Sequence, residues 1–277
     1  MVSMLSIGQP KFFKVKGGRD KKQQVISFDF ELQADYISTL IESHMIQEIK
    51  NELAVLADAA DGLFLQRFFK TGPGQYGEGD LFRGIRVPPL RKLAAAYLDL
   101  PLEQAALLLS SNYHEDRLLA LLILVGKFKL GDEAERGAIY RLYLQNTRFI
   151  NNWDLVDASA EHIVGGYLLG RDCRPLHGLA RSGSIWERRI AIMATFHFTR
   201  RGSFDKTLEI AEMLLQDRED LIHKAVGWML REVGKRDLQA EEAFLAAHYR
   251  QMPRTMLRYA IERFAEERRQ GYLKGML

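Results

Sequence analysis

Cysteine is almost absent from this chain, since Cys173 is the only one among 277 residues. A single cysteine cannot form an internal disulfide or a cluster of thiolate ligands. The composition therefore suits a reducing compartment, and we expect a cytoplasmic protein. We expect Cys173 itself to be a small, buried or half-buried packing residue.

Long apolar runs are also missing. The most apolar stretch, residues 118–125, is far too short to cross a bilayer, and the mean hydropathy is −0.19. Residues 1–10 lack the basic segment followed by a sustained apolar core that marks a secretory signal. We therefore expect no association with a membrane.

The residue patterns of two classes of functional site, metal sites and P-loops, are missing from the sequence. The histidines are scattered, and no group of His, Asp or Glu has the spacing of metal ligands, so we expect neither a metal nor another cofactor. The Gly-rich stretch 70–80 is not followed by Gly-Lys-Ser/Thr, which excludes a P-loop. That stretch cannot be helical throughout, and two interpretations remain open: a structural connection between helices, or a mobile loop that rests near a ligand.

The charge balance is only mildly basic. The formal net charge is +3 and the sequence pI is about 8.9. Such a balance permits a nucleic-acid partner if the positive charge gathers on one face, but does not require one. With 47% hydrophobic and 27% charged residues, the chain is not disordered by composition and can bury a large core.

Residues 1–44 differ from the rest of the chain. They have little helical periodicity and carry a run of Lys and Arg around Gly17 and Gly18. We expect a basic, flexible extension, with a contact to DNA phosphates or a start site assigned too far upstream as alternatives. A good helix begins near Met45, and we expect one domain over residues 45–277.

From Ile46 onward, apolar residues recur with the 3.6-residue period of amphipathic helices, while the alternation typical of strands is nearly absent. Short linkers such as 131–132 and 216–218 place Asp, Ser or Asn where helices begin. Paired helices that recur every 35 to 45 residues or so predict an all-α superhelix, a solenoid of the HEAT or armadillo kind with a concave ligand face. The predicted helices are 46–53, 63–69, 88–98, 102–109, 118–128, 134–144, 153–168, 175–181, 186–198, 204–215, 221–233, 241–249 and 256–264.

Trp153 and Asp157 form the most informative pair. A spacing of four places the indole and the carboxylate on one face of a helix. Arg189 and Trp228 follow at about one repeat each, so all four side chains are predicted to meet on one patch of the concave face. An aromatic wall beside an acid is suited to stabilising a cationic reacting group.

Several segments carry a family resemblance. Asn-Asn-Trp-Asp-Leu-Val-Asp at 151–157, Ile-Trp-Glu-Arg-Arg at 185–189 and Lys-Ala-Val-Gly-Trp-Met-Leu-Arg-Glu at 224–232 resemble the AlkD-type DNA alkylation repair glycosylases. Residues 66–70 and 82–88 are similar to the N-terminal region of that family. The resemblance extends over about residues 46 to 267, and its three C-terminal motifs are fairly specific in combination.

The resemblance implies roles for individual residues. It implies that Asp157 stabilises the sugar cation and positions water, that Trp153 and Trp228 pack on the deoxyribose, and that Arg189 holds a phosphate. It also implies that cationic N3- and N7-alkylated purines leave duplex DNA without base flipping. Further predicted DNA contacts are Arg188, Lys224, Lys70 and Arg86.

The chemistry supports these implied roles. Alkylation of a purine ring nitrogen makes the base cationic and a good leaving group, and its departure leaves an oxocarbenium-like sugar. A nearby carboxylate stabilises that charge and takes a proton from incoming water. No Lys in these motifs suggests Schiff-base chemistry, so we expect a monofunctional hydrolase, acting as a monomer.

Each residue also has a purely structural interpretation. Trp153 and Trp228 would be core residues, Asp157 would cap a helix or pair with a neighbour, and Arg189 would form a surface or interhelical salt bridge. We expect Trp186 to be structural, and Arg231 and Glu232 to form interhelical pairs. The alternatives to a glycosylase are a non-catalytic solenoid that binds DNA or protein, and a module directed at RNA.

Overall fold

A computed structural model describes residues 45–277, and the extension predicted over residues 1–44 lies outside the described residues. The described part is built from helices, and its only bridge between extended segments joins Leu81 to Tyr113. No helix in it is long and apolar enough to span a membrane. The prediction of an all-α superhelix is confirmed.

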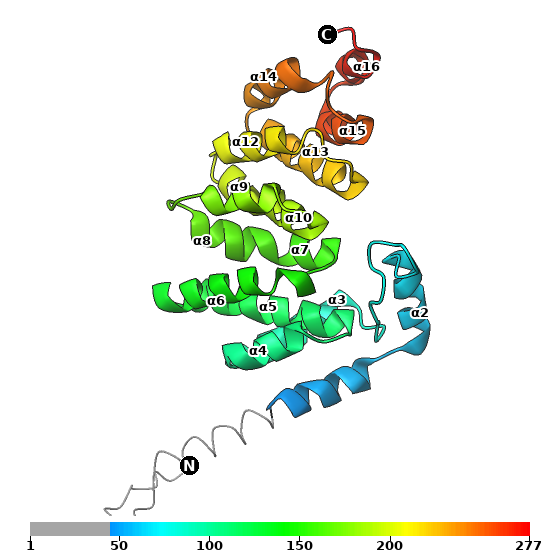
Figure 1. The fold of residues 1–277 in the computed structure, drawn as a ribbon, viewed down its shortest axis with the longest axis vertical. Coiled ribbons are helices and arrows are strands. Elements are labelled where there is room, and N and C mark those ends of the chain that lie inside the picture. The colour runs from blue at the N-terminus through cyan, green and yellow to red at the C-terminus, as the bar shows by residue number, and fades with distance from the viewer. Residues whose placement is uncertain (1–44) are drawn as a thin grey trace, which may run out of the picture. The chain divides into compact units, whose positions relative to one another are not determined.

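The helices follow one another with short connections (Figure 1). After the helical residues 45–56, they are α2 (Ala59–Phe68), α3 (Val87–Ala96), α4 (Leu102–Leu109), α5 (His114–Leu130), α6 (Glu133–Gln145), the 3-10 turn η1 (Thr147–Phe149), α7 (Trp153–Ala160), the π-helical turn η2 (Glu161–Gly165), α8 (Gly166–Leu168), α9 (Arg174–Ala180), α10 (Ile185–Ala194), α11 (Phe196–Thr199), α12 (Asp205–Met213), α13 (Asp220–Gly234), α14 (Leu238–His248), α15 (Arg254–Ala260), the 3-10 turn η3 (Ile261–Arg263) and α16 (Glu266–Lys274).

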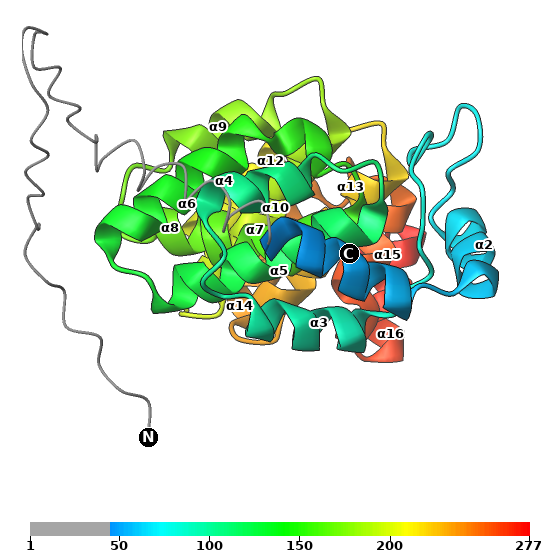
Figure 2. The same cartoon turned by 90° about the horizontal axis from the view of Figure 1, so that it is seen from below.

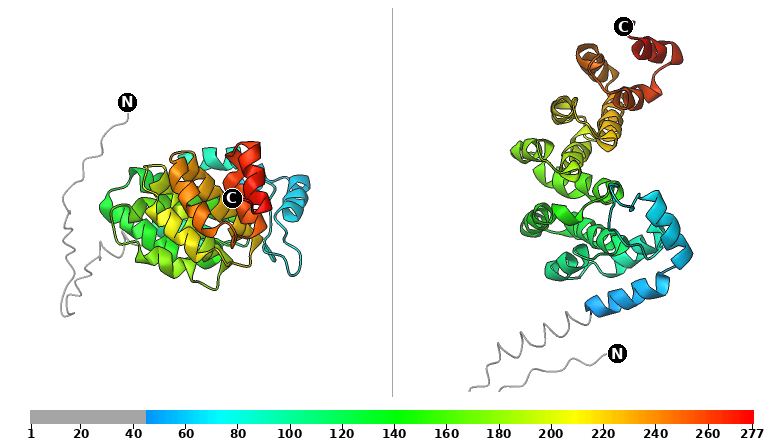
Figure 3. Two further views of the ribbon diagram at one scale, coloured as in Figure 1. Left: turned by 90° about the horizontal axis from the view of Figure 1, so that it is seen from above. Right: turned by 45° about the vertical axis from the view of Figure 1, so that its right-hand side comes forward.

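These helices form two layers. In the inner layer α3, α5, α7, α10, α13 and α15 each pack against the next, while α4, α6, α9, α12 and α14 pack outside them. The right-hand view of Figure 3 shows the helix pairs stacked in chain order. The inner helices α7, α10, α13 and α15 begin at residues 153, 185, 220 and 254, close to the lower end of the predicted repeat. Equivalent positions of successive repeats therefore lie side by side on one face.

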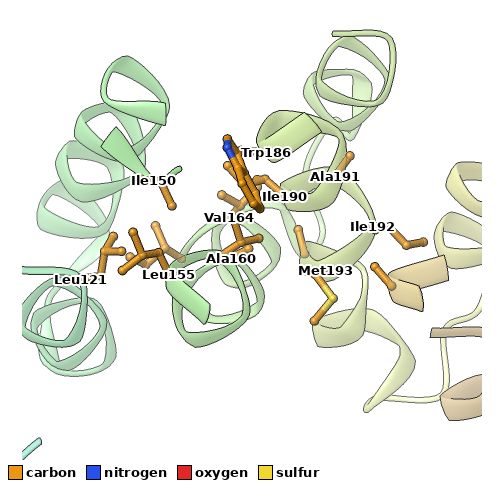
Figure 4. Close-up of a cluster of buried hydrophobic side chains, with 14 of the residues drawn as sticks. Leu121, Ile150, Leu155, Ala160, Val164, Trp186, Ile190, Ala191, Ile192 and Met193 are labelled. Carbon is orange, nitrogen blue, oxygen red and sulfur yellow. The ribbon is translucent and has the colours of Figure 1, made fainter. Parts of the chain in front are cut away.

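Apolar side chains fill the space between the layers. Ile150, Leu155, Val164 and Ile190 are fully buried, and Trp186 is 8% exposed. Figure 4 shows Leu121, Ile150 and Leu155 together where α5 meets α7, and Trp186 beside Val164 and Ile190 where η2 meets α10. The structural role predicted for Trp186 agrees with this position.

The last helix was not predicted. α16 is mostly polar, with Tyr272 as its buried residue, so it has no apolar rhythm. Tyr272 packs edge-on against Tyr249 and Phe264, with ring centroids 5.3 and 5.7 Å apart. A tertiary contact therefore holds a helix that the sequence pattern did not indicate.

The Gly-rich segment is a connection between α2 and α3. Seen along the stack in Figure 2, α2 and the loop after it stand to one side of the other helices. Residues 83–85 are held by the buried carboxylate of Glu115, which accepts hydrogen bonds from the backbone N–H groups of Arg83 (2.9 Å), Gly84 (2.8 Å) and Ile85 (3.1 Å). Glu115, in the first turn of α5, thus fixes this segment on that helix.

Candidate active site

The inner layer carries an open cleft of about 630 Å³. Trp153, Asp157, Arg189 and Trp228 all line it, so the predicted meeting of these four side chains is confirmed. They come from α7, α10 and α13. The rest of the lining is Phe68, Lys70, Tyr76, Ile185, Glu219, Asp220, Leu221, Lys224, Arg231 and Tyr259.

The cleft continues toward the N-terminal helices. A neighbouring hollow of about 550 Å³ shares Phe68, Trp153 and Asp157 with it, and a third of about 500 Å³ shares Asp157. Asp157 is the one residue that lines all three of these hollows. A ligand that follows the inner layer must therefore pass over its carboxylate.

Trp153 begins α7. The side chain of Asn152 caps this helix and accepts a hydrogen bond from the Trp153 N–H, at 2.8 Å. The indole stacks on Phe69, with ring centroids 5.4 Å apart and planes at 27°, and meets Phe68 edge-on at 6.2 Å. These aromatic contacts, together with the cap, fix the ring at the edge of the cleft.

Asp157 lies one turn further along α7 and pairs with Arg189. The guanidinium donates through Nε to one carboxylate oxygen at 2.9 Å and through Nη2 to the other at 2.8 Å. Its third arm, Nη1, donates to the Leu221 carbonyl of α13 at 2.6 Å. Arg189 thus bridges three neighbouring helices of the inner layer.

The two side chains differ in exposure. The side chain of Asp157 is 18% exposed, whereas that of Arg189 is 6% exposed. Burial raises the pKa of Asp157 above its usual range, and the Arg189 guanidinium opposes that effect. The structure therefore shows Arg189 as the partner that holds the carboxylate, and its contact with a phosphate stays a prediction.

Trp228 faces the same cleft from α13. Its indole N–H donates to the Glu232 carboxylate one turn later, at 3.3 Å, and its ring lies 6.2 Å from that of Phe196. Glu232 is held in turn by Lys235 and Arg236. Arg231 pairs with Glu262 in η3, so its predicted interhelical pair is found. The ion pairs of Glu232 are with residues three and four positions later, so its predicted interhelical pair is not found among the described residues.

The other predicted DNA contacts have varied positions. Lys224 lines the cleft and pairs with Asp220 at 2.7 Å, and Lys70 lines it with its Nζ 5.9 Å from the centre of the Tyr76 ring. Arg86 lines the neighbouring hollow and donates to Asp61 at 2.8 Å.

Arg188 lies elsewhere than predicted. It lines none of these hollows, and its guanidinium donates to Asp217 at 2.6 Å and to the Ser182 carbonyl at 3.0 Å. Only 17% of its side chain is exposed. Because a helical step of one residue turns a side chain by about 100°, Arg188 serves the fold while Arg189 reaches the cleft.

Sequence reasoning missed several residues of the inner face. Arg91, Lys129 and Arg258 are exposed, line hollows there and form no ion pair among the described residues. Tyr76 reaches the cleft from the Gly-rich loop. No sequence spacing indicates these positions, because the loop and the helices α3, α5 and α15 meet only in the folded chain.

Metal binding finds no support in the described residues. Over residues 45–277, no three His, Cys, Asp or Glu side chains are arranged to hold an ion. What the cleft offers is a carboxylate between two indoles, with cations around it. That arrangement can stabilise positive charge at a reacting carbon and bind an anionic polymer.

Comparisons with known proteins agree with this picture. The family model of the DNA alkylation repair enzyme matches residues 49–264. No curated protein matches the chain. Among solved structures, the chain is similar to one titled "Predicted DNA alkylation repair enzyme from Enterococcus faecalis", with 17% sequence identity and a TM-score of 0.59. The match covers 76% of this chain and 97% of that one, and at this identity it shows a shared fold.

Proposed function

The chain belongs to the DNA alkylation repair enzyme family, and on that premise we propose that it is a monofunctional DNA glycosylase acting on cationic alkylpurines. Its substrates would be N3- and N7-alkylated purines in duplex DNA. The observation that carries the proposal is the Asp157 carboxylate, which lines the same open cleft as Trp153 and Trp228.

The proposed reaction breaks the bond between C1′ and the purine nitrogen. The bonding electrons go to the base, which neutralises its positive charge, and an oxocarbenium-like sugar remains. The Asp157 carboxylate stabilises this cation, while the indole faces of Trp153 and Trp228 attract its polarised C–H groups. Water then adds to C1′, and Asp157 accepts its proton.

Arg189 supports this chemistry through Asp157. Its two hydrogen bonds fix the orientation of the carboxylate, and its charge favours the ionised form. An ionised carboxylate is what both steps require, first as a countercharge and then as a base. In our proposal Arg189 is thus a positioning residue, with a direct phosphate contact as an additional role.

The open form of the cleft favours recognition without base flipping. Enzymes that extrude a base enclose it in a snug pocket. Here the Asp157 side chain is 18% exposed at the floor of a wide cleft, where a duplex can approach from the side. Without an enclosing pocket, only lesions that are already labile would be excised.

Single-turnover release of 7-methylguanine and 3-methyladenine from methylated duplex DNA tests the proposal. We expect the wild-type protein to release both bases and Asp157→Asn to be slower by roughly 10²–10³-fold, because the change removes charge but keeps shape. Asp157→Asn should retain its affinity for DNA.

A neighbouring ion pair supplies the matched control. Asp217 pairs with Arg188 at 2.6 Å and is similarly buried, yet it lies outside the cleft. Asp217→Asn therefore breaks a comparable pair and should excise at the wild-type rate, with melting temperatures showing that both variants fold. Binding of DNA without release of either base by the wild type would favour the binding-module alternative.

A further inference from the structure

Hydrogen bonds between its own residues hold the loop between α2 and α3 in shape. The Gln75 side chain accepts a hydrogen bond from Gly72 N–H at 3.0 Å, and the Glu78 carboxylate accepts one from Gly74 N–H at 2.8 Å. Gly77 N–H donates to the Lys70 carbonyl at 3.1 Å. A Cβ atom at Gly77 would lie 2.6 Å from the Phe69 carbonyl oxygen, so a larger residue does not fit there.

The end of the loop is anchored in the inner layer. Asp80 is 6% exposed, and its carboxylate meets Arg117 at 2.7 Å, Asn151 at 3.1 Å and His114 at 3.4 Å. The other ring nitrogen of His114 lies 2.8 Å from Asp154, next to Trp153. One buried polar network thus ties the end of the loop to α5 and to the start of α7.

This anchoring places Tyr76 in the cleft. Its ring meets Trp186 edge-on, with centroids 6.0 Å apart, and the Lys70 Nζ lies 5.9 Å from its centre. Tyr76 lines the same cleft as Asp157, Arg189 and Lys224. The phenol therefore has both an aromatic ring and cations among its neighbours.

The hydroxyl of Tyr76 is suited to donate a hydrogen bond. Burial raises its pKa, and the Trp153 indole N–H beside it partly opposes that effect. The group therefore stays protonated at neutral pH and can donate to an anionic oxygen. Asp154, Lys224 and Arg189 lie close enough to affect its titration, so an anion near this hydroxyl would feel the charges of one carboxylate and two cations.

We propose that Tyr76 is a substrate-binding residue, whose hydroxyl donates to a phosphate oxygen of the lesion-bearing strand beside Trp153. Its ring then adds to the aromatic lining of the cleft. This inference rests on the proposed function, since it supposes that duplex DNA occupies the cleft.

A double-mutant cycle between protein and DNA tests the contact. Tyr76→Phe removes only the hydroxyl, and a neutral methylphosphonate placed at each phosphate near the lesion in turn removes one acceptor charge. The probe is a duplex with a tetrahydrofuran abasic analogue, and affinity is measured by fluorescence anisotropy. We expect Tyr76→Phe to weaken binding by roughly 3- to 10-fold, the range for one lost hydrogen bond. At one phosphate the two changes together should cost no more than either alone.

Two further variants complete the set. Tyr76→Ala removes the ring as well and should weaken binding more than Tyr76→Phe. Tyr113→Phe is the matched control, because this half-buried tyrosine packs on Arg83 and lines none of the hollows around Asp157. It should bind like the wild type. Equal affinity of the wild type and Tyr76→Phe, or additive losses at every phosphate, would overturn the proposal.

Base release measured in parallel separates this inference from the proposed function. Release of alkylpurines by the wild type, with unchanged binding and release by both Tyr76 variants, would contradict the Tyr76 contact and leave the proposed function standing. Weaker binding by Tyr76→Phe, with no release even by the wild type, would keep the contact and remove the glycosylase. If the wild type neither binds the duplex nor releases a base, the Tyr76 contact and the proposed function are both contradicted.

Discussion

At the scale of single residues, the pairing of Asp157 with Arg189 decides what the cleft can do. A half-buried carboxylate without a partner would favour its neutral form, because burial disfavours charge. Arg189 counters this effect with a two-pronged contact at 2.9 and 2.8 Å. The pair therefore sets the pH at which Asp157 ionises.

We predict that Arg189→Gln moves the acid limb of the excision profile to higher pH. Without the guanidinium the pKa of Asp157, already raised by burial, rises further, and the rate depends on the ionised form. The variant should therefore lose more activity at pH 6 than at pH 8 in single-turnover measurements. Arg188→Gln, a control outside the cleft, should leave the profile in place. An equal loss at all pH values would instead indicate that Arg189 acts on a phosphate.

Glu241 gives a second residue-scale prediction. It is 2% exposed on α14, and burial, with the nearby charge of Glu242, raises its pKa to about 8. A carboxyl with a raised pKa stabilises the fold below its unfolded-state pKa, near 4.3, and this contribution is lost as pH rises through about 8. The melting temperature should thus fall between pH 5 and 9.

Glu241→Gln should remove that decline. The amide keeps the shape without ionising, so the variant should be more stable than the wild type at pH 9, by up to about 5 kcal/mol. Thermal unfolding followed by circular dichroism across this range is the measurement. The exposed Glu103→Gln is the control and should follow the wild type. A variant that declines as steeply as the wild type would show that Glu241 ionises freely.

At the scale of elements, the close approach of inner helices holds the site together. Gly227 on α13 precedes Trp228, and a Cβ atom there would lie 2.4 Å from the Met256 carbonyl oxygen of α15. Small residues let two helix backbones approach in this way. The position of the Trp228 indole therefore depends on the contact between α13 and α15.

We predict that Gly227→Ala destabilises the protein despite the better helix propensity of alanine. Overpacking costs about 1–3 kcal/mol, which for a chain of this size lowers the melting temperature by roughly 3–10 °C. Gly178→Ala is the matched control, because Gly178 lies within α9 and a Cβ atom there meets nothing within 4 Å. That variant should gain about 0.5–1 kcal/mol. Equal stability of both variants would mean that α15 shifts freely.

At the scale of the whole molecule, cations that form no ion pair within residues 45–277 follow the inner face. Arg91 on α3 and Arg258 on α15 lie at opposite ends of the row of hollows, with Asp157 between them. Charges spread along one face suit the regular phosphates of a duplex better than a compact ligand.

We predict that Arg91→Gln and Arg258→Gln each reduce the salt dependence of duplex binding. Each lost phosphate contact should lower the slope of log Kd against log salt by about 0.9, and the double variant should lose about twice as much. Arg141→Gln is the control, because Arg141 is exposed on the outer helix α6. Slopes identical to that of the wild type would exclude both residues from the interface.

The sequence by itself determined the class of fold and the centre of the site. The 3.6-residue apolar period directly reflects helix geometry, and the spacing of Trp153, Asp157, Arg189 and Trp228 reflects the repeat, so both were readable without coordinates. The polar helix α16 was not predicted, because its single buried side chain, Tyr272, produces no apolar period.

Only the tertiary structure decided which groups complete the site. Arg188 and Arg189 are adjacent in sequence, yet in the folded chain Arg188 pairs with Asp217 and Arg189 pairs with Asp157. Tyr76 reaches the cleft because Asp80 is anchored by residues more than thirty positions away along the chain. Such long-range contacts leave no periodic signal, since they depend on how separate helices meet and not on the local order of residues.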